Sequence, residues 1–112
     1  MSTRLDAPRA SHLSHDQLER LRQLLLNEYN TQQARAVELQ DPVDLEPDLA
    51  EVLLARCNDA MVEIDAALAR IAAGSSGLCL SCQSAIPYER LEIVPAADRC
   101  VICQADRDRD FR

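Results

Sequence analysis

Two pairs of cysteines constrain this chain more than any other feature of its sequence. The first pair is Cys79-Leu-Ser-Cys82 and the second is Cys100-Val-Ile-Cys103, with seventeen residues between them. Each pair can present two sulfurs from one tight turn, and this separation is typical of a four-cysteine zinc site. Four protein ligands leave no coordination position for water or substrate. The sequence therefore predicts one structural Zn²⁺ and not a catalytic one.

Three other interpretations of the cysteines stay open at this stage. A single pair could be a redox dithiol, and the four thiols could form two disulfides or lie apart as buried side chains. The duplicated spacing, in a chain without a recognisable signal sequence, favours metal. Four thiolates around one Zn²⁺ leave a net charge of about −2, which N–H donors and a nearby cation would offset. Arg90 and Arg99 are the candidate cations.

The composition indicates a small helical protein. The 112 residues include two Gly, three aromatic residues and no Trp, which favours helices over a β-sandwich or a large globular core. The net charge of −7 is the wrong sign for binding driven by nucleic-acid phosphates. No catalytic constellation of side chains is visible, so we do not expect an enzyme. Neither a membrane-spanning run nor a targeting segment is recognisable, so we expect a cytoplasmic protein.

A first helix is predicted from Ser14 to about Gln40. The Ser14 side chain can accept a hydrogen bond from the first turn while Gln17 reaches back to the Ser14 N–H, which makes a capping box. Leu13 and Leu18 flank this box as a hydrophobic staple. Apolar residues then recur at helical spacing and predict one buried stripe: Leu18, Leu21, Leu25, Tyr29, Ala36 and Leu39.

A second helix is predicted after the Asp41-Pro42 break. Asp44 is its expected N-cap, and Pro47 is tolerated because first-turn N–H groups lack helical partners. Gly74 is the expected C-terminal cap, and residues 74–77 are expected to form a short flexible joint. The matching apolar stripe is predicted to contain Leu49, Leu53, Cys57, Ala60, Ile64, Ala67 or Leu68, and Ile71. On that stripe Cys57 is expected to be a small core residue and not a fifth ligand.

Two helices of similar length joined by a turn predict a mainly α fold built on an antiparallel coiled-coil hairpin. We expect a flexible N-terminal arm at residues 1–13 and the hairpin at 14–73, with its tip at 41–46. Residues 74–112 are expected to form the zinc-finger module and a short C-terminal helix. Asp41 and Asp44 would lie at the end of a rod about 40 Å long. Capping roles explain both residues, but acidic groups on a protruding rod also suggest a probe that enters another molecule.

Five segments together carry a resemblance to a known family. They are Asp41-Pro-Val-Asp44, Gly77-Leu-Cys79-Leu-Ser-Cys82, Ile86-Pro-Tyr-Glu-Arg-Leu-Glu92, Pro95-Ala-Ala-Asp98 and Cys100-Val-Ile-Cys103-Gln104. With these segments, nearly all of residues 14–105 resemble the DksA/TraR family of bacterial RNA polymerase-binding transcription factors. The family tip commonly reads Asp-x-x-Asp-x-Ala, and here Glu46 occupies the position of the Ala.

The resemblance implies a monomeric factor that binds RNA polymerase at the secondary channel. Its tip, with Asp41 and Asp44, would point toward the catalytic centre and alter transcription initiation without specific DNA contacts and without a membrane. Two alternatives from other classes are a zinc- or redox-responsive switch and a zinc-ribbon nucleic-acid-binding protein, which the acidic charge disfavours.

The resemblance also bears on the alarmone guanosine tetraphosphate. The best-known family member helps polymerase to bind this nucleotide through basic residues. Matching of the zinc motifs places those positions on Glu63, Val94 and Gln104, none of which is positively charged. Because phosphate groups gain much of their affinity from charge-assisted hydrogen bonds, we expect weak or no dependence on the alarmone.

Overall fold

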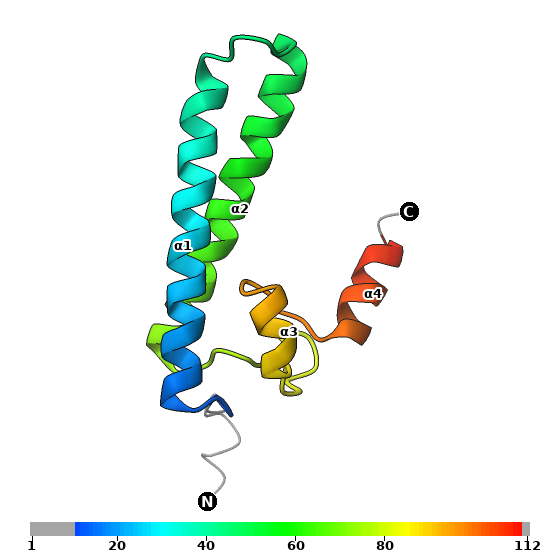
Figure 1. The fold of residues 1–112 in the computed structure, drawn as a ribbon. Coiled ribbons are helices and arrows are strands. Elements are labelled where there is room, and N and C mark those ends of the chain that lie inside the picture. Colours follow the sequence, from blue (N-terminus) through cyan, green and yellow to red (C-terminus); the bar gives the residue numbers. More distant parts are fainter. Residues whose placement is uncertain (1–10, 111–112) are drawn as a thin grey trace, which may run out of the picture.

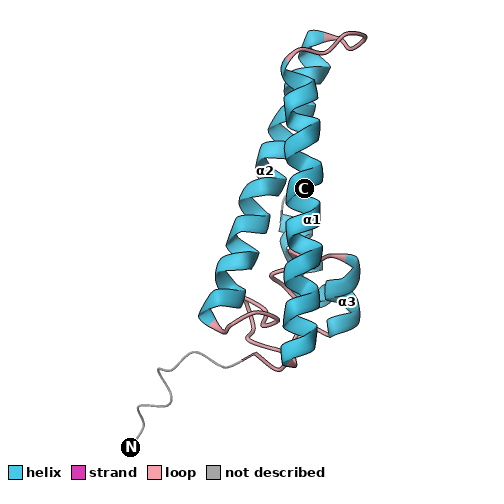
Figure 2. Ribbon diagram, turned by 60° about the vertical axis from the view of Figure 1, so that its left-hand side comes forward, coloured by secondary structure: helices cyan, strands magenta, loops and turns pink. Residues whose placement is uncertain are grey.

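The computed structural model describes residues 11–110, which contain four helices: α1 (His15–Gln40), α2 (Pro47–Ala73), α3 (Tyr88–Ile93) and α4 (Val101–Asp110). The long helices α1 and α2 lie antiparallel, and α3 and α4 lie beside the end of the hairpin that is farthest from its turn (Figure 1). The only β pairing in the described part of the chain is an isolated antiparallel bridge between Leu78 and Ala85, so helices and loops dominate (Figure 2). The predicted mainly α hairpin fold is confirmed.

The start of α1 has the predicted capping box. The Gln17 N–H donates to Ser14 Oγ at 3.1 Å, and the Ser14 N–H donates to Gln17 Oε1 at 2.9 Å. Leu13 is buried and Leu18 packs against the same core, as the predicted hydrophobic staple requires. Local sequence therefore fixes where the first helix begins.

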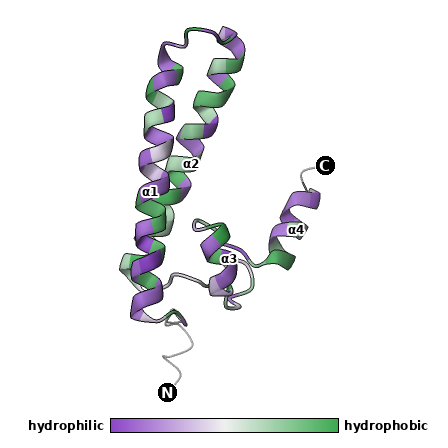
Figure 3. Cartoon of the chain, viewed as in Figure 1, coloured by the Kyte–Doolittle hydropathy of each residue, from purple (hydrophilic) through white to green (hydrophobic). Residues whose placement is uncertain are grey.

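The two long helices bury matching apolar stripes on each other. In Figure 3, hydrophilic and hydrophobic stretches alternate along α1, which is typical of a helix that buries one side. The buried residues of α1 are Leu21, Leu25 and Ala36, and those of α2 are Ala50, Cys57, Ile64 and Ala67. All of these belong to the predicted stripes except Ala50.

The prediction that Leu49 belongs to the α2 stripe is wrong. Leu49 is 46% exposed, whereas Ala50 is 4% exposed and takes its place. Two turns of α-helix take about 7.2 residues, so Ala50, seven residues before Cys57, lies on the same face as that buried thiol. Leu49 is displaced from that face by about 80° of helical rotation.

The predicted N-cap of α2 is also wrong. Glu46, not Asp44, is the capping residue, and no side chain donates or accepts a capping hydrogen bond there. Pro47 occupies the first turn of α2, where its fixed φ favours the helical conformation and its missing N–H needs no partner. The proline starts the helix without help from the tip side chains.

Ser76 and Gly77 are buried, so the prediction of a flexible joint at residues 74–77 is wrong for the second half of this segment. Gly74 has a φ of 81° and its N–H bonds Arg70 O and Ile71 O, which confirms it as the C-terminal cap of α2. The next residue, Ser75, donates its N–H to Arg70 O at 3.0 Å. Ser76 is 4% exposed, so the end of this segment is packed where the hairpin meets the cysteine module.

Residues 11–13 contact the joint at residues 74–77. Most of the predicted arm at residues 1–13 lies outside the described residues, but residues 11–13 are packed on the protein. The Ser11 N–H donates to Gly74 O at 3.0 Å, and Leu13 is 7% exposed. The ring of His12 lies against Gly77, where an added Cβ would meet Cε1 at 3.0 Å. Residues 11–13 therefore hold the junction between the rod and the cysteine module.

Gly77→Ala is expected to destabilise the protein by about 2 kcal/mol or more, because Gly77 has a φ of +86° and its new methyl group must also displace His12. Gly74→Ala is the matched control. Its φ is +81° but nothing lies within 4 Å of the added Cβ, so only backbone strain of about 1 kcal/mol is expected. Denaturant unfolding of the zinc-loaded variants measures both changes. A His12→Ala/Gly77→Ala double variant should recover most of the difference, and equal costs for the two single variants would contradict the role of His12.

Candidate metal centre

The first pair of cysteines lies on a tight turn between the joint and α3. The Gln83 N–H donates to Cys79 O at 3.0 Å and the Cys79 N–H donates to Ser84 O at 2.9 Å. Gln83 has a φ of 68°, a conformation that lets the chain reverse within this turn. The turn presents both Cys79 and Cys82 toward the start of α4.

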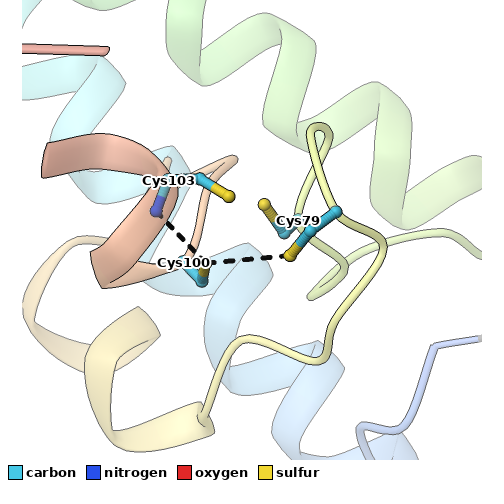
Figure 4. Close-up of side chains that lie close together, drawn as sticks. Cys79, Cys100 and Cys103 are labelled. Carbon is cyan, nitrogen blue, oxygen red and sulfur yellow. Dashed lines mark hydrogen bonds between the residues drawn. The ribbon is translucent and has the colours of Figure 1, made fainter. Parts of the chain in front are cut away.

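The second pair lies at the start of α4. Cys100 precedes the helix and Cys103 lies in its first turn, where the Gln104 N–H bonds Cys100 O at 2.9 Å. The Cys103 N–H also points at Cys100 Sγ, with 3.4 Å between nitrogen and sulfur. Figure 4 shows Cys100 and Cys103 opposite the loop that carries Cys79. A backbone bond from Leu80 N–H to Asp98 O, 2.8 Å long, holds the two segments together.

The four sulfurs form one compact group that fits a tetrahedral metal ion. The Sγ atoms of Cys79, Cys82, Cys100 and Cys103 all lie within 4.8 Å of one another. A tetrahedral Zn²⁺ with bonds of about 2.3 Å needs sulfurs about 3.8 Å apart, and the Sγ atoms of Cys82 and Cys100 are 3.8 Å apart. All of these cysteines are free, which excludes the disulfide alternative in this structure. The donor set and its size suit a single zinc ion, as the sequence predicts.

Charge explains why this group of thiols needs a cation. Burial by itself would raise the pKa of Cys79, but N–H groups of Cys100, Cys82 and Ser81 lower it to about 6. Hydrogen bonding with Ser84 lowers the pKa of Cys82. The neighbouring thiols of Cys100 and Cys79 raise the pKa of Cys103 to about 12. The sulfurs cannot all ionise side by side unless a metal ion compensates them.

The two arginines expected to assist the thiolates have different roles. Arg99 donates from Nε to Ser81 Oγ at 3.3 Å and pairs with Asp98 at 3.2 Å. It therefore supports the first cysteine turn through Ser81. Arg90 instead lines a hollow between α2, α3 and α4, and its buried Nε has no hydrogen-bond partner within residues 11–110.

The metal centre is continuous with the hydrophobic core at the base of the hairpin. Cys79, Ile86 and Leu91 are each no more than 1% exposed. They share one cluster with Leu21 and Leu25 of α1, while Cys100 and Cys103 pack against its edge. Cys57 is buried on α2 and does not belong to the sulfur group, in agreement with its predicted role as a core residue.

The tip lies at the opposite end of the hairpin from the sulfurs. Asp41 follows α1 and its N–H bonds Glu38 O at 3.4 Å, whereas Asp44 lies in the turn itself. Both side chains are exposed. Within residues 11–110 neither carboxylate has a hydrogen bond or an ion pair, so neither charge stabilises the fold.

The structure brings the three predicted alarmone positions around one hollow of about 440 Å³. Glu63 of α2, Val94 after α3 and Gln104 of α4 all line it, together with Asp98. Three arginines line the same hollow: Arg70 and Arg107, which the sequence did not point to, and Arg90, which was expected to assist the thiolates. Burial lowers the pKa of Arg70 and the nearby Asp98 raises it. The three arginines are far apart in the sequence, and only the packing of the cysteine module beside α2 brings them to one hollow. No local sequence pattern therefore indicates that they lie together.

Comparisons with known proteins agree with this geometry. Residues 74–109 match the family model described as the prokaryotic dksA/traR C4-type zinc finger. The whole fold is similar to the structure of transcription factor DksA2 from Pseudomonas aeruginosa, with a TM-score of 0.72 and 27% sequence identity. That similarity covers 96% of this chain and 95% of the other. No curated protein sequence matches the chain significantly. The family match explains the sulfur group as a zinc finger, and the structural match extends the likeness to the hairpin.

Purified protein is expected to contain about one zinc ion per chain, and Cys82→Ser or Cys100→Ser should abolish stoichiometric binding. Because structural zinc supplies about 10–16 kcal/mol of apparent binding free energy in small peptides, residues 78–104 should lose their order in these variants. Metal analysis and amide NMR spectra measure the two effects. Cys57→Ala is the matched control: it should keep the metal and cost at most a few kcal/mol as a core truncation. Zinc lost from the Cys57 variant but kept by the Cys82 variant would overturn the assignment.

Proposed function

We propose that this chain, whose residues 74–109 match the dksA/traR C4-type zinc finger, is a transcription factor of the DksA/TraR family that binds RNA polymerase at the secondary channel and inserts the hairpin tip toward the catalytic centre. In this proposal the protein works in the bacterial cytoplasm as a monomer, alters transcription initiation and makes no specific contacts with DNA. It acts by filling part of the channel and by placing the carboxylates of Asp41 and Asp44 near the catalytic centre, and it does not convert a substrate. The zinc finger has a structural part only, since its ion has four protein ligands.

One observation carries the proposal. Asp41 and Asp44 are exposed at the end of the rod, and the helix that follows begins at Pro47 without a side-chain cap. Asp44 therefore does not have the structural role that would explain an aspartate at this position. A carboxylate that the fold does not use, held far from the core by two helices, is suited to act inside another molecule.

The shape of the protein supports the same proposal. The molecule measures 61 × 35 × 24 Å, and α1 extends about 39 Å at 1.5 Å per residue. Its base is held by the shared core of α1, α2 and the cysteine module. A narrow rod on a wider base can enter a channel while the base stays at the rim. Among residues 11–110 no helix is both long and apolar enough to cross a membrane.

Asp44→Asn is expected to keep most of the affinity for core RNA polymerase and to lose most of the effect on transcription initiation, because the base supplies most of the binding and the Asp44 carboxylate acts inside the channel. Pull-down with core polymerase and a run-off transcription assay measure the two properties, with a DNA-only binding assay beside them. Since Asn caps helices about as well as Asp, a purely structural role predicts no change. A wild-type protein that binds DNA and not polymerase would refute the proposal, and full activity of Asp44→Asn would remove the role of the tip.

We further propose that dependence on guanosine tetraphosphate is weak or absent. The positions inferred for phosphate contacts hold Glu63, Val94 and Gln104, and the carboxylates of Glu63 and Asp98 offset part of the positive charge of the three arginines nearby. A ligand with several phosphate charges needs more cationic donors than this balance offers.

Addition of the nucleotide is therefore expected to change transcription by less than about twofold in the presence of this protein. The assay needs an alarmone-sensitive promoter and polymerase whose factor-independent alarmone site has been disabled. Glu63→Lys is the informative variant, because it restores a cation at the rim of the hollow and should increase the response. Strong synergy with the wild-type protein that disappears in Arg70→Gln or Arg90→Gln would refute the proposal and assign phosphate binding to those arginines.

A further inference from the structure

The tip contains an apolar hollow beneath its acidic turn, and this inference rests on the proposed function. The hollow measures about 430 Å³ and lies between the end of α1 and the start of α2. Its apolar lining consists of Leu39, Pro42, Leu45, Pro47, Ala50 and Leu54. We call it the tip socket. Figure 1 places this region at the end of the hairpin farthest from α3 and α4.

The leucines of the tip socket are only half-buried in the free protein. Leu39, Leu45 and Leu54 are of intermediate exposure, and Ala50 is the one lining residue that is buried. The small side chain of Ala50 fills little of the space between the helices. Apolar groups in a hollow that stays open to water gain free energy when another apolar side chain covers them.

The charge around the tip socket has one sign. Residues 36–55 contain six acidic residues and no basic residue, against a net charge of −7 for the whole chain. The acidic residues are Glu38, Asp41, Asp44, Glu46, Asp48 and Glu51, and all six side chains are exposed. Such a rim repels nucleic acid and other acidic surfaces, and it favours a partner that carries Lys or Arg.

We propose that the tip socket binds a basic segment of RNA polymerase that inserts one apolar side chain between the two helices. The apolar side chain would cover Leu45 and Leu54, while flanking Lys or Arg residues would pair with the acidic rim. This arrangement has the anatomy of an interface hot spot, in which a buried apolar contact is surrounded by a polar rim. It assigns affinity to the tip in addition to the effect of Asp44 on transcription.

Leu45→Gln tests the socket, and Leu49→Gln is its matched control. Leu45 lies in the turn outside both helices, so the substitution should leave the fold intact, which a thermal melt checks. Leu49 is 46% exposed near the same end of α2 but does not line the socket. The effect on transcription at half-saturating protein should fall about tenfold for Leu45→Gln and stay near wild type for Leu49→Gln. Equal behaviour of the two variants would overturn the proposal.

A photoreactive amino acid at position 45 identifies the occupant. The proposal expects a cross-link to one polymerase peptide that contains Lys or Arg beside an apolar residue. Cross-links to an acidic peptide, to nucleic acid or to a second copy of this chain would refute it, and so would the absence of any cross-link from a protein that activates or inhibits transcription. If the wild-type protein does not bind polymerase, both the proposed function and this inference are refuted. If it binds polymerase but position 45 forms no cross-link to it, only this inference is refuted.

Discussion

Cys79 joins the metal centre to the hydrophobic core. Its sulfur belongs to the four-cysteine group, and its residue is fully buried in the cluster that contains Leu21 and Leu25 of α1. A core of this size is too small to hold a separate module by apolar packing alone. Zinc binding and hydrophobic burial therefore stabilise the same residues, and the rod depends on that shared base for its direction.

The second pair of cysteines shows the same dependence from the other side. Helix α4 makes no close backbone approach to α1, α2 or α3 in the described chain, and its first turn carries exposed apolar residues, with Ile102 74% exposed. Cys100 and Cys103 are the residues through which α4 joins the core. A zinc ion held by the four sulfurs would therefore cross-link the start of α4 to the core and fix one wall of the hollow lined by Arg90 and Gln104.

Sequence reasoning succeeded where local physical signals were strong. The capping box at Ser14, the αL glycine at Gly74 and the spacing of the cysteine pairs each predict a feature of the structure from a few adjacent residues. It failed where contacts between residues distant in the sequence determine the structure. The start of α2 depends on Pro47, and the packed joint depends on contacts with residues 11–13, which are distant in sequence. The three arginines of the hollow come together only through tertiary structure, so no local pattern could reveal them.

The absence of a side-chain cap at the tip has a consequence for evolution. Because Pro47 starts α2 by its own geometry, the residues of the turn at 41–46 are released from the task of maintaining the fold. Substitutions there change the exposed end of the rod while the scaffold keeps its stability. Sequences that share this scaffold can therefore differ at these six positions without a loss of stability, so the tip is the part of the hairpin that is freest to change.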